Sequence, residues 1–461
     1  MSVKVGFAQT DLMDILAEKR NCEMPVSGVA FHLAQNGRNS FFFTVDFMDF
    51  DLQTVNTLKN TLSKVLPEQT EIHILTTHNH GAGSCSDLDM ERFCSHAAEC
   101  AVQAVKNAAE CKLRFASGPI DRDITFSRRI FVPEAEGSFT CFYGIDPEQP
   151  ENASAFVKRA LTALENDSLC FTGDGSAENC SSFRFKKADP FLAVLEFRTM
   201  DDIPLGNIVR FASHAVCCNL PDCYSSDYPG YLRKLMQETL GGVSLFWNGP
   251  CAEIAPAISA KSAGNGKNFA KILAKNALRM LNNSSFQPLA YFRDTAWQIN
   301  MPVRGEVLTG KVIHSREPDT PAGKKKHLEY QRLNGIMPFL QGIYRNGEKS
   351  VQETIPVSAA MLELNDCNFL FFCGETFSKT AREITGRFPE YSWITVTEHG
   401  RTAMYIPPEQ EYFRGGYEPA CAVVAPDGEE ELRKQMIALL QTEFKNNENA
   451  EKGRNKNENL D

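Results

Sequence analysis

The chain has 461 residues, of which 43% are hydrophobic, with a formal net charge of −10 and a pI of about 5.5. This acidic balance argues against nucleic acid and against an anionic membrane surface as the main partner. The length is compatible with one large α/β unit or with about three domains.

The first residues contain neither the apolar core nor the cleavage site of a signal peptide. No segment reaches the roughly 18 consecutive apolar residues of a membrane span. We therefore expect a cytoplasmic protein whose fifteen cysteines are mostly reduced thiols. A thiol metal site around Cys217, Cys218 and Cys223 is the less favoured alternative.

Strand-like and helix-like segments alternate along the chain, which is typical of an α/β protein with a mixed or mostly parallel sheet. Runs rich in Val, Ile and Phe predict strands at residues 3–11, 40–50, 71–78, 207–214, 243–249, 296–303, 353–375 and 392–400. Apolar residues at helical spacing predict helices at residues 51–66, 89–110, 228–242, 268–281, 376–388 and 429–444.

The composition also suggests how the chain is organised. We expect one α/β catalytic domain over residues 1–430, with a variable insertion at about 300–350, where residues 315–335 are charged and turn-rich. A closing helix at 431–445 and a disordered tail at 446–461 would follow. No carboxy-terminal β-sandwich domain is expected after this helix.

Four residues able to bind a metal come directly after predicted strands. His78, His214 and Glu375 each follow an apolar run, and Tyr405 comes shortly after another. In α/β sheets, ligands bind at the carboxyl ends of strands, so these side chains are expected to meet. Two histidines and a carboxylate supply the donors of a catalytic zinc site. Taken singly, each of them is an ordinary loop or helix-start residue.

Two other families with an HxH motif fit less well. Metallo-β-lactamase-type sites need an Asp-His pair after HxH, but Gly81, Ala82 and Gly83 follow His80 here. Amidohydrolase barrels need an eightfold strand-helix repeat, which the chain does not contain.

The ordered motifs TTHNHGAG (76–83), FASHAV with SSDYPGYL (211–232), LFWNGPCAEIAP (245–256), FFCGETF (371–377) and MYIPPEQEYFRGGYE (404–418) together resemble the catalytic domain of neutral/alkaline, non-lysosomal ceramidases. The resemblance runs from about residue 3 to about residue 425. It implies a zinc-dependent hydrolase of N-acyl amides that acts on a lipid or another small-molecule amide.

The resemblance implies that Zn²⁺ is bound by His78, His214, Glu375 and Tyr405. It places His80 beside the metal, where it would polarise the amide carbonyl or stabilise the oxyanion.

Two further residues carry over from the family pattern. Arg128, in FSRRIF, would be a second oxyanion or substrate contact, with Ser127 where the family has Asn. Tyr417 would face the substrate, and it or Tyr405 would protonate the leaving amine. His399 is a weaker proton donor, since we expect it to be an exposed loop residue.

One departure bears on the mechanism. Ala255 stands where the family has its proposed catalytic serine, so a water molecule is the expected nucleophile. The alternatives to a ceramidase-like enzyme are a hydrolase of soluble N-acyl, amino-sugar or cell-wall amides, and a non-catalytic metal-binding scaffold. Nothing in the sequence indicates the oligomeric state.

Overall fold

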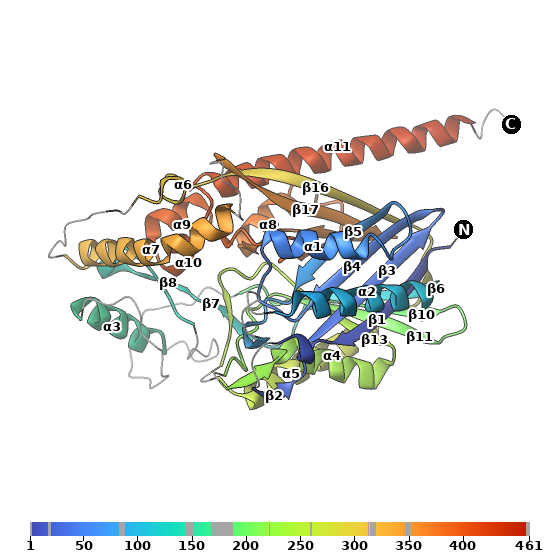
Figure 1. Cartoon of the computed structure of the whole chain (residues 1–461), viewed down its shortest axis with the longest axis horizontal. Coiled ribbons are helices and arrows are strands. Elements are labelled where there is room, and N and C mark those ends of the chain that lie inside the picture. The colour runs from blue at the N-terminus through green and yellow to red at the C-terminus, as the bar shows by residue number, and fades with distance from the viewer. Residues whose placement is uncertain are drawn as a thin grey trace.

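A large and a small β-sheet form the centre of the molecule (Figure 1). The computed structural model describes residues 2–16, 20–82, 88–142, 152–166, 188–220, 222–258, 261–311, 313, 320–345 and 352–457. The large sheet has nine strands in the order β13-β11-β10-β6-β1-β3-β4-β5, with β15 paired to β6. These strands are β1 (Lys4–Asp11), β3 (Ser27–Gln35), β4 (Arg38–Val45), β5 (Thr70–Thr76), β6 (Ala109–Pro119), β10 (Phe191–Thr199), β11 (Pro204–Phe211), β13 (Val243–Asn248) and β15 (Gln287–Pro288).

The small sheet has four strands in the order β16-β17-β18-β20. They are β16 (Phe292–Pro302), β17 (Thr354–Leu364), β18 (Cys367–Phe371) and β20 (Trp393–Val396). Both sheets are mainly antiparallel, but β4 runs parallel to β5, β11 to β13, and β18 to β20. The predicted α/β class with a mixed sheet is therefore confirmed.

Short strand pairs and helices complete the fold. The pairs are β2 (Asn21–Met24) with β12 (Cys223–Ser225), β7 (Thr125–Ser127) with β14 (Ile254–Pro256), β8 (Arg129–Val132) with β9 (Gly137–Thr140), and β19 (Glu375–Thr376) with β21 (Tyr405–Ile406). The helices are α1 (Leu52–Leu62), α2 (Met90–Lys106), α3 (Asn152–Glu165), α4 (Asp227–Leu240), α5 (Ala263–Leu281), α6 (Gly305–Thr309), α7 (Pro321–Arg345), α8 (Ser378–Thr385), α9 (Glu409–Arg414), α10 (Tyr417–Ala420) and α11 (Gly428–Asn457).

Alternating side chains along the strands pack the two sheets against each other. Phe42 of the large sheet and Phe371 of the small sheet belong to one buried cluster, with ring centroids 5.5 Å apart. Their neighbours point the other way, because successive side chains on a strand face opposite sides. Phe41 and Phe43 thus pack under α1 and α2, and Phe372 packs with α8 and α11.

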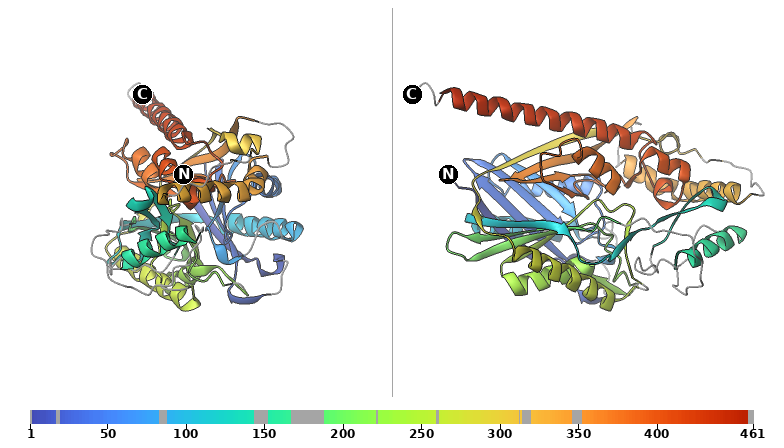
Figure 2. Two further views of the ribbon diagram at one scale, coloured as in Figure 1. Left: turned by 90° about the vertical axis from the view of Figure 1, so that its left-hand side faces the viewer. Right: turned by 180° about the vertical axis from the view of Figure 1, so that it is seen from behind.

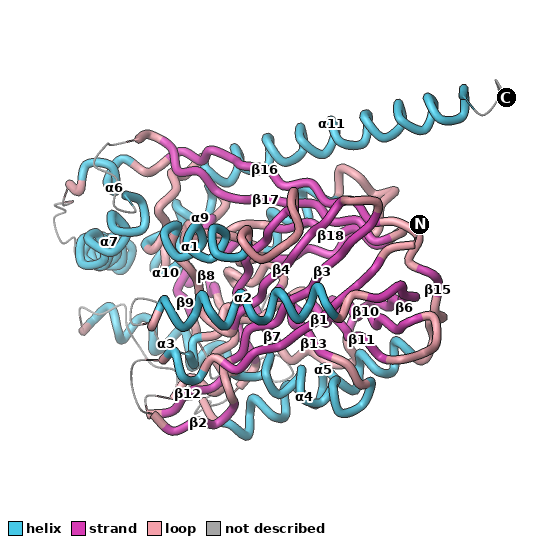
Figure 3. Tube along the Cα trace, turned by 45° about the vertical axis from the view of Figure 1, so that its right-hand side comes forward, coloured by secondary structure: helices cyan, strands magenta, loops and turns pink. Residues whose placement is uncertain are grey.

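The result is four layers, helix-sheet-sheet-helix (Figure 3). Helices α1 and α2 cover one half of the outer face of the large sheet, and α4 and α5 cover the other half. Helix α11 lies along β16 on the outer face of the small sheet and extends past it (Figure 2). A carboxylate caps the start of α1, where Asp51 accepts a hydrogen bond from the amide of Thr54 at 2.7 Å.

Two segments differ from the sequence-based expectation. Residues 321–335, predicted to be loop, form the first part of α7. Leu328, Leu333, Met337, Leu340 and Tyr344 recur at helical spacing there and are buried. The backbone of residues 446–457, predicted to be disordered, continues α11, because no proline interrupts this segment. Residues 458–461 lie outside the described part of the chain.

Within the described residues, no disulfide joins any of the cysteines. Burial raises the pKa of Cys217 well above its usual value. Within the described residues, no helix is both long and apolar enough to span a membrane.

Candidate active site

The candidate site lies at one end of the sheets, where the parallel strand pairs finish. His78 comes two residues after β5, and His214 comes three residues after β11. Glu375 and Tyr405 open β19 and β21 and face each other as neighbours in that strand pair. The extensions of β5 and β11 meet in an isolated parallel bridge between Asn79 and Ala215, and the backbone amide of His80 donates to the carbonyl of Ala215 at 3.2 Å.

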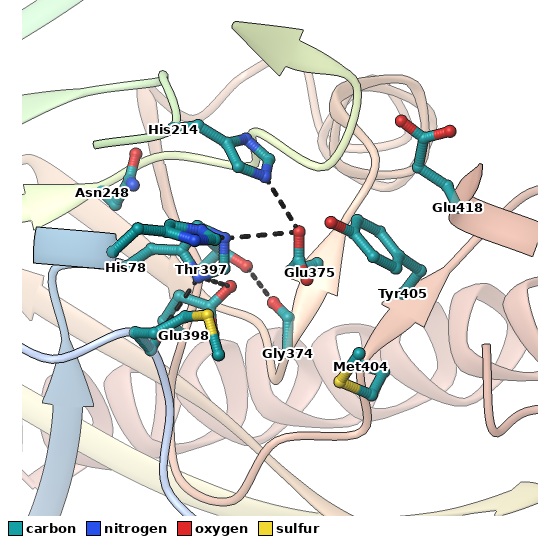
Figure 4. Close-up of polar contacts among 12 residues, drawn as sticks. His78, His214, Asn248, Gly374, Glu375, Thr397, Glu398, Met404, Tyr405 and Glu418 are labelled. Carbon is teal, nitrogen blue, oxygen red and sulfur yellow. Dashed lines mark hydrogen bonds and ion pairs between the residues drawn. The ribbon is translucent and has the colours of Figure 1, made fainter. Parts of the chain in front are cut away.

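The side chains meet closely (Figure 4). Oε2 of Glu375 is 3.0 Å from Nε2 of His214 and 3.3 Å from Nε2 of His78. Nε2 of His80 is 3.4 Å from Nε2 of His78. One ligand nitrogen from each of the three histidines lies within 4.8 Å of the others. Three imidazoles and a carboxylate thus share one centre.

Backbone carbonyls orient two of these imidazoles. Nδ1 of His78 is 3.1 Å from the carbonyl oxygen of Met48, and Nδ1 of His214 is 3.0 Å from that of Ile254. A carbonyl oxygen only accepts, so in both rings Nδ1 carries the proton. When the ring is neutral, its Nε2 therefore turns a lone pair to the centre, which is the usual arrangement of metal-binding histidines.

The backbone at the HxH motif is strained and held from several sides. His78 has a φ of 56°, in the left-handed region that is uncommon for residues other than glycine. The buried side-chain amide of Asn248 donates to the carbonyls of Thr77, at 3.2 Å, and Ser213, at 3.0 Å. Asn248 thereby joins the two residues that precede His78 and His214.

A buried ion pair supports the same loop. Nη1 of Arg233 donates to Oδ1 of Asp46 at 2.7 Å, and the hydroxyl of Thr77 reaches the same carboxylate at 3.3 Å. The amide of Asn79 donates to the carbonyl of Asp46 at 3.0 Å and to that of Ser225 at 2.8 Å. This network fixes the loop that carries both histidines.

A second buried carboxylate, which the sequence analysis did not single out, touches His78. Oε1 of Glu398 is 3.4 Å from Nδ1 of His78 (Figure 4). Burial raises the pKa of Glu398 to about 8, partly opposed by His78. Glu398 follows β20, so its position at a strand end was the signal available in the sequence.

The two carboxylates Glu375 and Glu398 favour a positive charge at the centre. Burial by itself lowers the pKa of His78, but Glu398 and Glu375 outweigh it and raise that pKa to about 9. Burial lowers the pKa of His214 to about 4 and that of His80 well below its usual value. His80 and His214 are therefore neutral near pH 7 and able to donate a lone pair to a cation.

Arg128 and Tyr405 form a second buried group beside the centre. Nη2 of Arg128 donates to the hydroxyl of Tyr405 at 2.8 Å, and its Nε donates to Glu418 at 2.8 Å. Arg129 donates to the other oxygen of Glu418 at 2.6 Å. Despite burial, Arg129 and Arg128 lower the pKa of Glu418, which the sequence analysis also missed. In Figure 4 the phenol of Tyr405 points toward Glu375.

Tyr417 lies one step further out. Its ring centroid is 5.7 Å from that of Tyr405 and 5.3 Å from that of Phe142, in edge-on arrangements. Phe142 is 40% exposed, and Tyr417 is half-buried. The structure thus brings all seven candidate residues into one region, with Tyr417 at its outer side.

Two other residues of the sequence analysis lie elsewhere or differ from expectation. The side chain of Ala255 is buried in an apolar cluster with Phe126. His399 is buried, so its prediction as an exposed loop residue is wrong. Its Nε2 lies 2.9 Å from Nδ1 of His73, whose Nε2 lies 2.8 Å from Asp294.

Fold and site together define an α/β protein with a buried histidine-carboxylate centre across two stacked sheets. The same fold occurs in the structure of neutral ceramidase from Pseudomonas aeruginosa, with a TM-score of 0.63 and 13% identity over 95% of this chain and 74% of that one. A structure described as ceramidase complexed with C2 aligns with a TM-score of 0.62 and 14% identity over 96% and 76%.

These likenesses define a neutral ceramidase-like fold. No family model and no curated protein matches the sequence.

Proposed function

We propose that this protein is a zinc-dependent hydrolase that cleaves an N-acyl amide. The observation that carries the proposal is the convergence of Nε2 of His78 and His214 on Oε2 of Glu375, with Nε2 of His80 beside them. Mixed nitrogen and oxygen donors suit zinc. The ceramidase-like fold supports amide hydrolysis as the reaction.

In this proposal His78, His214, Glu375 and Tyr405 bind the metal. Bound zinc would lower the pKa of a water molecule and polarise the amide carbonyl. The orienting hydrogen bonds on Nδ1 of His78 and His214 keep both rings ready to bind it.

The remaining groups act on the substrate. Water adds to the carbonyl carbon, the C–N bond breaks, and the products are a carboxylic acid and an amine. His80 and Arg128 stabilise the negative charge on the carbonyl oxygen as it develops. A proton must reach the leaving nitrogen, and Tyr405 or Tyr417 supplies it. Burial raises the pKa of the Tyr417 phenol, so Tyr417 carries its proton near pH 7.

Release of free amine tests the proposal. Zinc-loaded protein is incubated with N-acyl amides that include a ceramide and soluble N-acyl compounds. We expect release from at least one of them, and none from the Glu375→Ala variant. Zinc binding without release from any amide would favour a non-catalytic metal-binding scaffold.

A further inference from the structure

Arg332, on α7, is a cation whose charge no residue in the described part of the chain neutralises. Its Cζ lies 5.7 Å from the ring centroid of Tyr417, so the guanidinium rests on the face of that ring. Arg332 is half-buried, yet it forms no ion pair and donates no hydrogen bond to any residue that the structure describes. A partly desolvated guanidinium with five unused donors is a receptor for an anion.

Four cations of the same region differ from Arg332 in this respect. Each of them pairs with a carboxylate: Arg128 with Glu418 at 2.8 Å, Arg129 with Glu411 at 2.8 Å, Arg414 with Glu411 at 3.0 Å, and Lys325 with Glu329. These cations therefore take part in ion pairs within the protein. Arg332 is left available for a ligand.

Aromatic rings connect Arg332 with the candidate metal centre. The Tyr417 ring contacts both Arg332 and Tyr405, with its centroid 5.7 Å from the Cζ of Arg332 and 5.7 Å from the Tyr405 centroid, and Phe142 packs edge-on against it. A molecule whose amide sits at Tyr405 and Glu375 would pass along Tyr417 to reach the guanidinium. Arg332 is thus placed to contact a group a few bonds away from the scissile amide.

We propose that Arg332 selects substrates that carry a carboxylate or a phosphate on the amine side or the acyl side of the amide. This inference rests on the proposed amide hydrolysis and narrows it from N-acyl amides in general to anionic ones. Arg332 pairs with the anion bidentately, and the Tyr417 face holds the guanidinium in place.

Matched amides test the inference. N-lauroylglycine, N-lauroyl-O-phosphoethanolamine and neutral N-lauroylethanolamine share the acyl chain and differ in the terminal group. We expect zinc-loaded wild type to show kcat/KM roughly 10- to 100-fold higher for the carboxylate or the phosphate compound than for the neutral one. The better of the two anions identifies the group. Arg332→Gln should lose this preference and keep its rate on the neutral amide.

Controls separate charge from fold. Lys326→Gln removes an exposed cation from the same helix and should leave the preference unchanged. Arg332→Lys keeps the charge without the planar fork and should retain part of the preference. If circular dichroism shows that Arg332→Gln does not fold, Arg332→Lys is compared with wild type instead.

A binding measurement makes the outcome independent of turnover. Calorimetry with the ketone analogues of N-lauroylglycine and N-lauroylethanolamine, in which a methylene group replaces the amide nitrogen, reports the same discrimination without hydrolysis. Equal affinities for both, or a preference that survives in Arg332→Gln, would overturn the inference. Hydrolysis of none of the three amides counts against the proposed function alone, because the calorimetry still decides the role of Arg332.

Discussion

Nη2 of Arg128 donates a hydrogen bond to the hydroxyl of Tyr405 at 2.8 Å, and both side chains are buried. The guanidinium reaches this position because Glu418 holds its Nε from the opposite side. A fixed cation beside a fixed phenol, next to Glu375, supplies the electrostatic part of the proposed chemistry. The contact joins residues that lie 277 positions apart in the sequence.

We expect the zinc content of purified protein to depend on the strand-end ligands. Elemental analysis should find about one zinc per chain in wild type and almost none in His78→Ala or Glu375→Ala. His96→Ala is the matched control, since His96 pairs with Asp14 on the surface. Wild-type protein that holds no metal after careful purification would rule out the zinc site.

The same measurement of zinc content distinguishes the role of His80 from that of His78. We expect His80→Ala to keep its zinc and to lose roughly 10²- to 10³-fold in kcat, because its imidazole stabilises developing charge. Loss of zinc from this variant would instead make His80 a ligand. The 3.4 Å spacing between Nε2 of His80 and Nε2 of His78 makes that comparison necessary.

Arg128→Lys should lose as much activity as Arg128→Met, although lysine keeps the positive charge. A lysine cannot bond Tyr405 and Glu418 together as the planar guanidinium does. We expect kcat to fall roughly 100-fold in both variants, with KM changing little. Steady-state kinetics check this, and full activity in the lysine variant would contradict it.

Asn248→Ala should destabilise the fold and disturb the site together. It leaves the buried carbonyl of Thr77 without its donor and the buried N–H of Ser213 without its acceptor, at a cost of about 2–4 kcal/mol in the free energy of unfolding. Urea denaturation measures this loss. Gln298→Ala, at a more exposed position on β16, is the control and should change stability by less than about 0.5 kcal/mol.

The acid stability of the protein should depend in part on Glu418. Its pKa in the folded state is lower than the ordinary value of 4.5, because Arg129 and Arg128 outweigh its burial. The unfolded chain then binds the proton more readily, so stability is fully present above about pH 4.5 and is lost as the pH falls through the folded pKa.

Denaturation curves at several pH values test this dependence. Glu418→Gln should be less stable than wild type at pH 7, and the difference should shrink as the pH falls below 4.5. A difference that stays constant with pH would show that the carboxylate charge contributes nothing.

The sequence allowed the main residues of the site to be predicted because position and chemistry coincide there. His78, His214 and Glu375 follow apolar runs, and strand ends meet at one edge of a sheet. Glu398 also follows a strand, but a single acidic residue there carries no distinguishing pattern. Asn248 acts through contacts with Thr77 and Ser213, and no local rule predicts contacts over such separations.

The fold was predictable in its class and less so in its arrangement. Periodicity identified strands such as β1, β4 and β11, but it missed β3, β6 and β10 of the large sheet, and it did not indicate the packing of a small sheet on a large one. That packing depends on side chains such as Phe42 and Phe371, which meet only in three dimensions. Helix α7 was missed because the charges of residues 315–335 obscured the buried spacing of Leu328 and Leu333.

The division of the site between the two sheets also sets an order of events during synthesis. His78 and His214 leave the ribosome well before Glu375 and Tyr405, which lie beyond residue 370. A nascent chain of 300 residues carries the imidazoles without the oxygen donors. The proposed metal centre is therefore complete only after the small sheet has docked, so activity would report the end of folding.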